Sequence, residues 1–265
     1  EAKNITLDKS RNVSIFKNEV TIITAEQNKI EADYVEYNRN EEFLILKNNI
    51  SAQDNQKNII KTNYAEYDEK NKIFKSKGNT EIITTDKYVI KTADVILDSM
   101  NKIILSESTT EIEDVDGNKV FLEGFEYSPQ NNIFRSVGKI EIRDNKQNSY
   151  DFSQIYIDTK KKEILGTDIK AFLNQKEFKL NKKNKPRVFA NTINLNKSKK
   201  QFDRSVFTLC DYRENDKCPP WTIQATKMLH DNKKKTIYYN NAVIKVYDVP
   251  IFYFPKLSHP DPSVE

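Results

Sequence analysis

A repeat of 30 residues runs through the first part of this chain and constrains its fold more than any other feature. Each copy has two apolar residues on either side of one other residue, followed by a small polar residue that favours a turn. Six copies follow without a gap, at Ile5-Leu7-Asp8, Val35-Tyr37-Asn38, Ala65-Tyr67-Asp68, Val95-Leu97-Asp98, Phe125-Tyr127-Ser128 and Ile155-Ile157-Asp158. Looser copies follow at Ile193-Leu195-Asn196 and Met228-His230-Asp231. A fixed period of this size indicates one supersecondary unit that stacks on itself.

Within one copy, apolar and polar residues alternate in the manner of a half-buried β-strand. In the copy that spans residues 60–84, the alternation slips by one residue between Tyr64 and Ala65, where we expect a β-bulge. Residues 68–72 form a polar turn, and the return strand begins at Ile73. Because a short turn forces neighbouring strands to be antiparallel, each copy is expected to be a hairpin.

The other copies keep this layout. Turns are expected at residues 38–42, 98–102, 128–132 and 158–163, with apolar residues starting each return strand and bends near Gly78, Gly138 and Gly166. The chain therefore predicts an all-β fold of roughly sixteen strands, a V-shaped, open β-jelly roll built from stacked antiparallel hairpins. A parallel β-helix would have shorter coils and no hairpin turn in every unit.

The apolar positions of the repeat are candidates for lining the gap between the two sheets. Alternation by itself favours a packed core there, whereas an interior that continues from end to end of an open stack would suit a conduit for a long or apolar ligand. The first and last strands of such a stack also expose unpaired backbone groups that favour strand addition by another chain. The predicted lining residues are Val35, Tyr37, Phe43, Ala65, Tyr67, Ile73, Val95, Leu97, Ile103, Phe125, Tyr127, Ile133, Ile155 and Ile157.

Composition and motifs argue against several classes of function. The net charge of +4 is small and spread along the chain, which favours a solvated surface over a nucleic-acid patch. No phosphate-binding loop, nucleophile elbow or zinc motif is present, and His230 and His259 lack cysteines at ligand spacing. We therefore predict no enzyme activity, no metal and no cofactor. A carbohydrate-active enzyme with paired carboxylates stays open, because the sequence selects no pair.

The carboxy-terminal segment differs from the repeats. It contains Cys210, a polar loop with Cys218, the only tryptophan, Trp221, then His230-Asp231 and the aromatic, Pro-flanked run at residues 249–255. This order of motifs resembles the LptD family of outer-membrane lipopolysaccharide-assembly proteins, and the Pro-rich ending looks like the join to a membrane barrel. The repeats, with Ala32-Asp33, Tyr67-Asp68 and Gly78-Asn79, are similar to the OstA-like jelly roll of lipopolysaccharide transport.

The resemblance implies a periplasmic domain on the inner side of the outer membrane of a Gram-negative bacterium. Residues 1–248 would be the jelly roll, and residues 249–265 would be a junction to a barrel. The domain would receive lipopolysaccharide from a homologous bridge protein by edge-strand pairing, shield its acyl chains, and pass it to the barrel and its plug lipoprotein. The alternative from the same pathway is the soluble bridge protein, which would not need the Cys-Trp segment.

The resemblance also bears on the cysteines. In the family, the cysteine before the tryptophan forms a disulfide with a barrel cysteine, and Cys210 matches that position. This sequence has an extra cysteine, Cys218, and none near residue 1. A Cys210–Cys218 disulfide is therefore a hypothesis, which an oxidising periplasm would permit.

Overall fold

The chain folds into antiparallel β-strands joined by tight turns and loops. A computed structural model describes residues 1–24, 27–174, 186–196, 198–210 and 220–260, and none of these residues is helical. The prediction of an all-β, antiparallel jelly roll is thereby confirmed. No helix that could cross a membrane occurs in these ranges. The chain divides into two compact units, residues 1–131 (unit 1) and residues 132–265 (unit 2).

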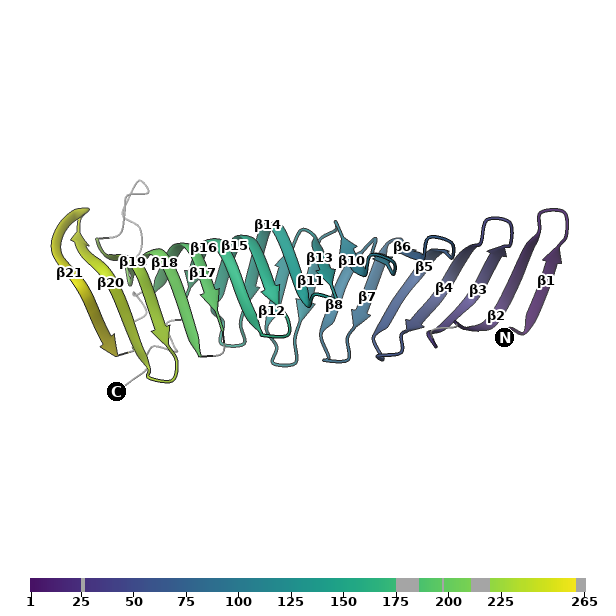
Figure 1. Ribbon diagram of the computed structural model, residues 1–265, viewed down its shortest axis with the longest axis horizontal. Helices are drawn as coiled ribbons and strands as arrows, with labels where there is room; N and C mark the ends of the chain where they lie inside the picture. The colour runs from purple at the N-terminus through teal and green to yellow at the C-terminus, as the bar shows by residue number, and fades with distance from the viewer. Residues whose placement is uncertain (25–26, 175–185, 197, 211–219, 261–265) are drawn as a thin grey trace. The chain divides into compact units, whose positions relative to one another are not determined.

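Unit 1 begins with long strands and continues with short ones (Figure 1). Its strands are β1 (Asn4–Asp8), β2 (Val13–Ile23), β3 (Lys29–Asn38), β4 (Phe43–Gln53), β5 (Ile59–Asp68), β6 (Ile73–Ser76), β7 (Asn79–Ile83), β8 (Val89–Ala93), β9 (Ile96–Asp98), β10 (Ile103–Ser106), β11 (Thr110–Glu113), β12 (Lys119–Leu122) and β13 (Phe125–Ser128). The division into short strands raises the number above the expected sixteen.

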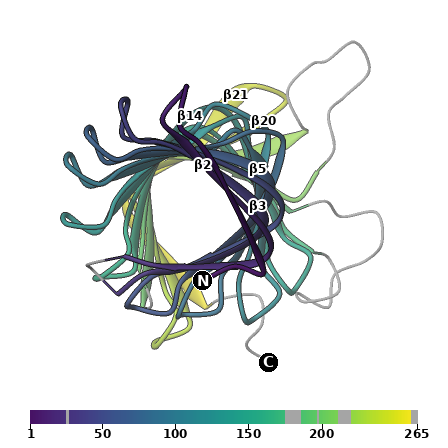
Figure 2. The same cartoon turned by 90° about the vertical axis from the view of Figure 1, so that its right-hand side faces the viewer.

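The short strands of unit 1 form two walls. One half of β5 pairs with β6, and the chain of pairings β6–β9–β10–β13 continues this first wall. The other half of β5 pairs with β7, and β7–β8–β11–β12 continue the second wall. Each long strand from β2 to β5 contributes to both walls by turning a corner, and Figure 2 shows the strands of this unit wrapping around their common interior.

A β-bulge forms the corner at which the long strands bend. It does not lie between Tyr64 and Ala65, where the sequence predicted it. The pairing of β4 with β5 shifts between Lys47 and Ile50, so the extra residue lies on β4, opposite Asn63. Asn48 and Asn49 take the left-handed backbone conformation, which asparagine tolerates better than most residues. The one-residue shift in the alternation of β5 at Tyr64 and Ala65 therefore results from the bulge on the neighbouring strand β4.

The turns at the first wall follow the expected chemistry. Asp68 accepts the backbone N–H of Asn71 at 2.9 Å and its side-chain amide at 2.7 Å, and Asp98 does the same with Asn101. The residue before each return strand has a positive φ, as Lys72 shows. The side chain thus supplies the hydrogen bond that a tight turn would otherwise leave to water.

Unit 2 contains longer strands that each run through the corner. They are β14 (Ile133–Arg143), β15 (Ser149–Asp158), β16 (Glu163–Phe172), β17 (Arg187–Leu195), β18 (Lys199–Thr208), β19 (Trp221–Asp231), β20 (Thr236–Val246) and β21 (Val249–Pro260). Each pairs antiparallel with the next. Gly138 has a positive φ within the register shift of β14, as expected of a bend.

Gly166 has a different role from the predicted one. It pairs with Ile155 and Ile193 inside the regular part of β16, and the positive φ of that strand falls on Asp168. A Cβ atom at Gly166 would collide with the ring of Phe152. This glycine therefore makes room for an aromatic core residue and does not form the bend.

Candidate functional site

The first apolar position of the repeat lies inside the fold in the copies after the first. Val35, Ala65, Val95, Phe125 and Ile155 are all buried, and Ala65 and Val95 have no exposed surface. In unit 1, Val35 and Ala65 belong to a cluster of packed side chains from both halves of the long strands. Its buried members are Val20, Ala32, Val35, Leu46, Ile50, Ala65 and Phe74.

The second apolar position of each repeat shares this inner face. Tyr67 and Leu97 pack against the buried cluster of unit 1. In the five copies after the first, the residue at this position is half-buried and stands two residues from a buried one on the same strand face; these residues are Tyr37, Tyr67, Leu97, Tyr127 and Ile157. The triplets of the repeat therefore point inward.

The predicted return positions are wrong by one residue. Phe43 and Ile73 lie opposite Asp68, whereas Leu44 and Phe74 lie opposite the inward-facing Tyr67. Because directly opposed residues share one face and neighbours along a strand alternate, the first residue of each return strand faces away from the interior. The residues corrected in this way are Phe43, Ile73, Ile103 and Ile133, and the inward residues are Leu44, Phe74, Ile104 and Phe134.

The inner face of unit 1 reaches an open edge at β1. This strand pairs with β2 and with no other strand in the described part of the chain. Ile5 lies opposite Phe16, which packs against the buried cluster, and Leu7 lies opposite Ser14. Ile5 and Leu7 are 59% and 58% exposed although they belong to the inner face. Apolar side chains of the inner face thus extend to the edge strand β1, where no other described strand covers them.

Buried hydroxyl groups interrupt the apolar interior in the middle of unit 1. The Thr92 hydroxyl lies 2.8 Å from that of Thr110 and 2.9 Å from that of Ser106, and the Thr80 hydroxyl donates to Ser76 at 2.7 Å. The sequence carried a signal for this hydroxyl ladder, because threonine and serine take the place of apolar residues at 30-residue spacing. Its members are Thr62, Ser76, Thr80, Thr92, Ser106 and Thr110.

The carboxy-terminal segment expected to be a junction forms a regular edge strand. Residues 249–260 are β21, which pairs with β20 from Thr236–Pro260 to Val246–Val249. The boundary expected at residue 249 thus falls inside a hairpin of unit 2. On β21, Phe252 lies opposite Ile244 and Phe254 opposite the fully buried Ala242, while Phe252 is 58% exposed. Unit 2 therefore also ends in a strand with uncovered apolar side chains.

The Cys-Trp segment lies partly outside the described residues. Cys210 is a half-buried free thiol after β18, and Cys218 lies outside the described residues, so the Cys210–Cys218 disulfide stays a prediction. Trp221 packs edge-on against Phe207, with ring centroids 6.2 Å apart, and its carbonyl accepts the Thr208 hydroxyl at 2.7 Å. These contacts give the tryptophan a structural role at the start of β19.

The histidines belong to strands. His230 is half-buried on β19, and His259 stacks on Tyr239 of β20 and lies 3.1 Å from its hydroxyl. Burial raises the pKa of Tyr239 far above its usual value, so this phenol stays neutral. No group of three or more His, Cys, Asp or Glu residues among those described could hold a metal ion.

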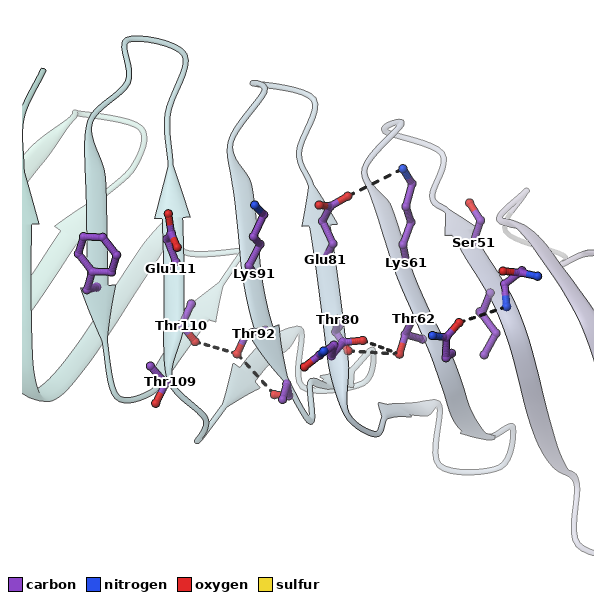
Figure 3. Close-up of a pocket in the computed structure, with 16 residues that line it drawn as sticks. Ser51, Lys61, Thr62, Thr80, Glu81, Lys91, Thr92, Thr109, Thr110 and Glu111 are labelled. Carbon is purple, nitrogen blue, oxygen red and sulfur yellow. Dashed lines mark hydrogen bonds and ion pairs between the residues drawn. The ribbon is translucent and has the colours of Figure 1, made fainter.

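A polar groove crosses the outer face of unit 1, and sequence reasoning did not find it. Figure 3 shows the groove, which has a volume of about 850 Å³. Exposed polar residues from the corner of the strands form its floor, including Asn49, Asn63 and Asn79. Its wall is a row of outward residues that lie opposite one another on six neighbouring strands: Ser51, Lys61, Glu81, Lys91, Glu111 and Phe121.

The carboxylates of this groove do not have the arrangement of a glycosidase. Glu81 and Glu111 stand in one row on the same face, and Lys91 lies between them, opposite both. A glycosidase needs two carboxyl groups on either side of the scissile bond. The row therefore gives no support to the enzyme alternative.

Comparison with known proteins gave no assignment. Neither a scan against protein-family models nor a search of curated proteins found a match.

Proposed function

We propose that this chain is a lipid-transport domain that shields the acyl chains of lipopolysaccharide between its walls. The observation that carries the proposal is the edge strand β1, where the inner-face apolar residues Ile5 and Leu7 are exposed. A self-contained core would end in covered or polar positions. An apolar face that ends in an open strand suits continuation by another chain.

The partner at β1 would be a second jelly-roll protein that adds a strand to this edge. Main-chain hydrogen bonds would hold the two edges together, and Ile5 and Leu7 would join the inner faces of both proteins. The acyl chains would then pass from one apolar interior to the next without entering water. Each buried CH₂ group contributes about 0.8 kcal/mol, so exposure of several chains during transfer would be costly.

The proposal requires the walls of unit 1 to separate. Ala65 and Val95 have no exposed surface, so an acyl chain reaches them only if the packed side chains between the walls move apart. Following the LptD resemblance, unit 2 would deliver the lipid to an outer-membrane barrel and its plug lipoprotein, with the domain on the periplasmic side. No nucleotide or metal chemistry enters this proposal.

Photocrosslinking in cells tests the proposal. A photoreactive amino acid at the inward Phe125 should crosslink to lipopolysaccharide, whereas the matched substitution at the adjacent, outward Glu126 should not. A second pair, Val35 and Glu36, repeats the comparison on β3. Ile5→Lys should reduce the crosslink at Phe125, because an inward charge on the edge opposes strand addition. Equal crosslinking from both faces would refute shielding between the walls.

A further inference from the structure

We propose that the polar groove on the outer face of unit 1 binds an uncharged or zwitterionic oligosaccharide. The side chains of the row Ser51, Lys61, Glu81, Lys91 and Glu111 face away from the apolar interior and do not enter the proposed lipid transport, although buried residues such as Ile50 and Thr92 also line the groove. The inference therefore stands or falls independently of the proposed function.

The wall of the groove is a straight row that the register fixes. Lys61 lies opposite Ser51 on one side and Glu81 on the other, and Lys91 lies opposite Glu81 and Glu111. Neighbouring strands are about 4.8 Å apart, so a row across six strands extends for about 24 Å. A site of this form suits an extended chain molecule more than a compact ligand.

Several polar groups in the groove are not engaged by the protein. In the described part of the chain, the Lys91 ammonium makes no ion pair or hydrogen bond, although it lies between two glutamates. Lys61 and Glu81 form a loose ion pair at 3.8 Å, which is too long for a hydrogen bond. The hydroxyl groups of Ser51 and Thr109 also make no hydrogen bond within that part. The Lys91 ammonium and these two hydroxyl groups are therefore available to a ligand.

The charges in the groove favour a ligand rich in hydroxyl groups over a polyanion. Lys61 and Lys91 alternate with Glu81 and Glu111, so the row has no net formal charge. At the end of the row, Lys119 bonds Glu111 at 2.8 Å and contacts Glu113 at 3.4 Å, which keeps this balance. A phosphate chain would meet a carboxylate at every second position. A sugar hydroxyl, by contrast, donates to a carboxylate and accepts from an ammonium.

The groove also contains an aromatic ring and amide groups. Phe121 ends the row on β12, and the three asparagines at the corner carry amide groups, each with both a donor and an acceptor. Asn49 already donates to Asp33 at 2.7 Å, which orients its amide. A sugar ring has apolar C–H faces and a polar rim, so this combination fits it.

Two-dimensional NMR of the full chain tests the inference with two soluble probes. One is a tetramer of N-acetylglucosamine, which is uncharged, and the other is the delipidated oligosaccharide of lipopolysaccharide, which carries carboxylates and phosphates. We expect the uncharged probe to shift amide signals of residues 49–63 and 79–111 and not those of unit 2. Shifts with the anionic probe alone would contradict the charge argument.

A matched pair of variants assigns the binding to the row. Lys91→Ala should weaken binding of the uncharged probe about tenfold, since it removes a hydrogen bond to a charged group. Lys75→Ala removes an equally exposed lysine from β6, outside the groove, and should leave the affinity unchanged. The absence of shifts with both probes would overturn the proposal, as would equal effects of the two variants. Neither result would bear on crosslinking from Phe125.

Discussion

The two units differ in how their strands form the corner between the walls. In unit 2, strands such as β15 run through the corner, and Phe152 and Ile140 fill the interior beside it. In the middle of unit 1 the strands are broken at the corner, and the equivalent positions are Thr92 and Thr110. Hydroxyl groups therefore accompany the broken strands, and large apolar side chains accompany the continuous ones.

The contrast has a physical basis in the backbone. Where a strand breaks, N–H and C=O groups lose their ladder partners and must find others. Ser76 accepts the N–H of Val95 at 2.9 Å, and Ser106 donates to the carbonyl of Ala93 at 2.7 Å. The hydroxyl ladder supplies hydrogen bonds to backbone groups at the breaks, whereas the core of unit 2 is stabilised by the burial of large apolar side chains. Five predictions test how far the two units differ, starting from the largest effect.

Phe152→Ala should destabilise the protein by about 3–5 kcal/mol, because it removes a buried ring and leaves a cavity. Thr62→Ala, at the equivalent position of unit 1, should cost about 1 kcal/mol, the usual value of one hydrogen bond. Urea unfolding followed by circular dichroism measures both.

A double-mutant cycle sharpens this comparison. Gly166→Ala should destabilise the native protein by about 1–3 kcal/mol through its clash with Phe152, and much less in the Phe152→Ala background. Additive effects would show that the glycine does not serve the aromatic ring.

Thr110→Val should cost about 1–3 kcal/mol, because it removes the hydroxyl that bonds the carbonyl of Ser108 and the hydroxyl of Thr92. Val20 and Ile140 at the equivalent repeat positions show that an apolar residue fits this place in other copies. A stabilising effect of Thr110→Val would show that hydrogen bonds of the hydroxyl ladder do not stabilise the interrupted strands.

Gly78→Ala should cost about 1 kcal/mol. Its φ of 77° lies in the left-handed region, and no atom lies within 4 Å of the added Cβ, so the cost is backbone strain alone. In unit 2, Asp168 takes a similar conformation with φ of 53°, and Asp168→Gly should be neutral or slightly stabilising. Thermal unfolding of both variants decides whether the two corners carry the same strain.

The smallest effect concerns the turns, where the two regions should behave alike. Backbone hydrogen bonds lower the pKa of Asp98 and that of Asp158 in the folded state, from Asn101 and Lys161 respectively. The stability from these carboxylates is therefore present above the ordinary aspartate pKa of about 3.9 and is lost as the pH falls further. Asp98→Asn and Asp158→Asn should each reduce the acid sensitivity of urea unfolding between pH 4 and pH 2. A difference between the two variants would mean that the turns also differ.

The spacing of residues predicted the strands and turns well, and the reason is local. An aspartate or asparagine at a strand end can close a turn with its own neighbours, as Asp68 does, and alternation then selects the buried face of the following strand. The inward direction of Val35 and Ala65 followed from that alternation. The return positions failed because Phe43 and Ile73 are apolar and yet lie opposite Asp68, a relation that only the register reveals.

By itself, the sequence determined that this chain is an antiparallel all-β stack with polar turns, since those features depend on contacts a few residues apart. Only the tertiary structure decided which strand carries each bulge, why Gly166 must lack a side chain, and that six outward residues form one groove wall. These features depend on pairing between strands, and a shift of one residue in register turns a side chain from one face to the other. Local chemistry specifies the elements of this protein, and the register between them specifies its surfaces.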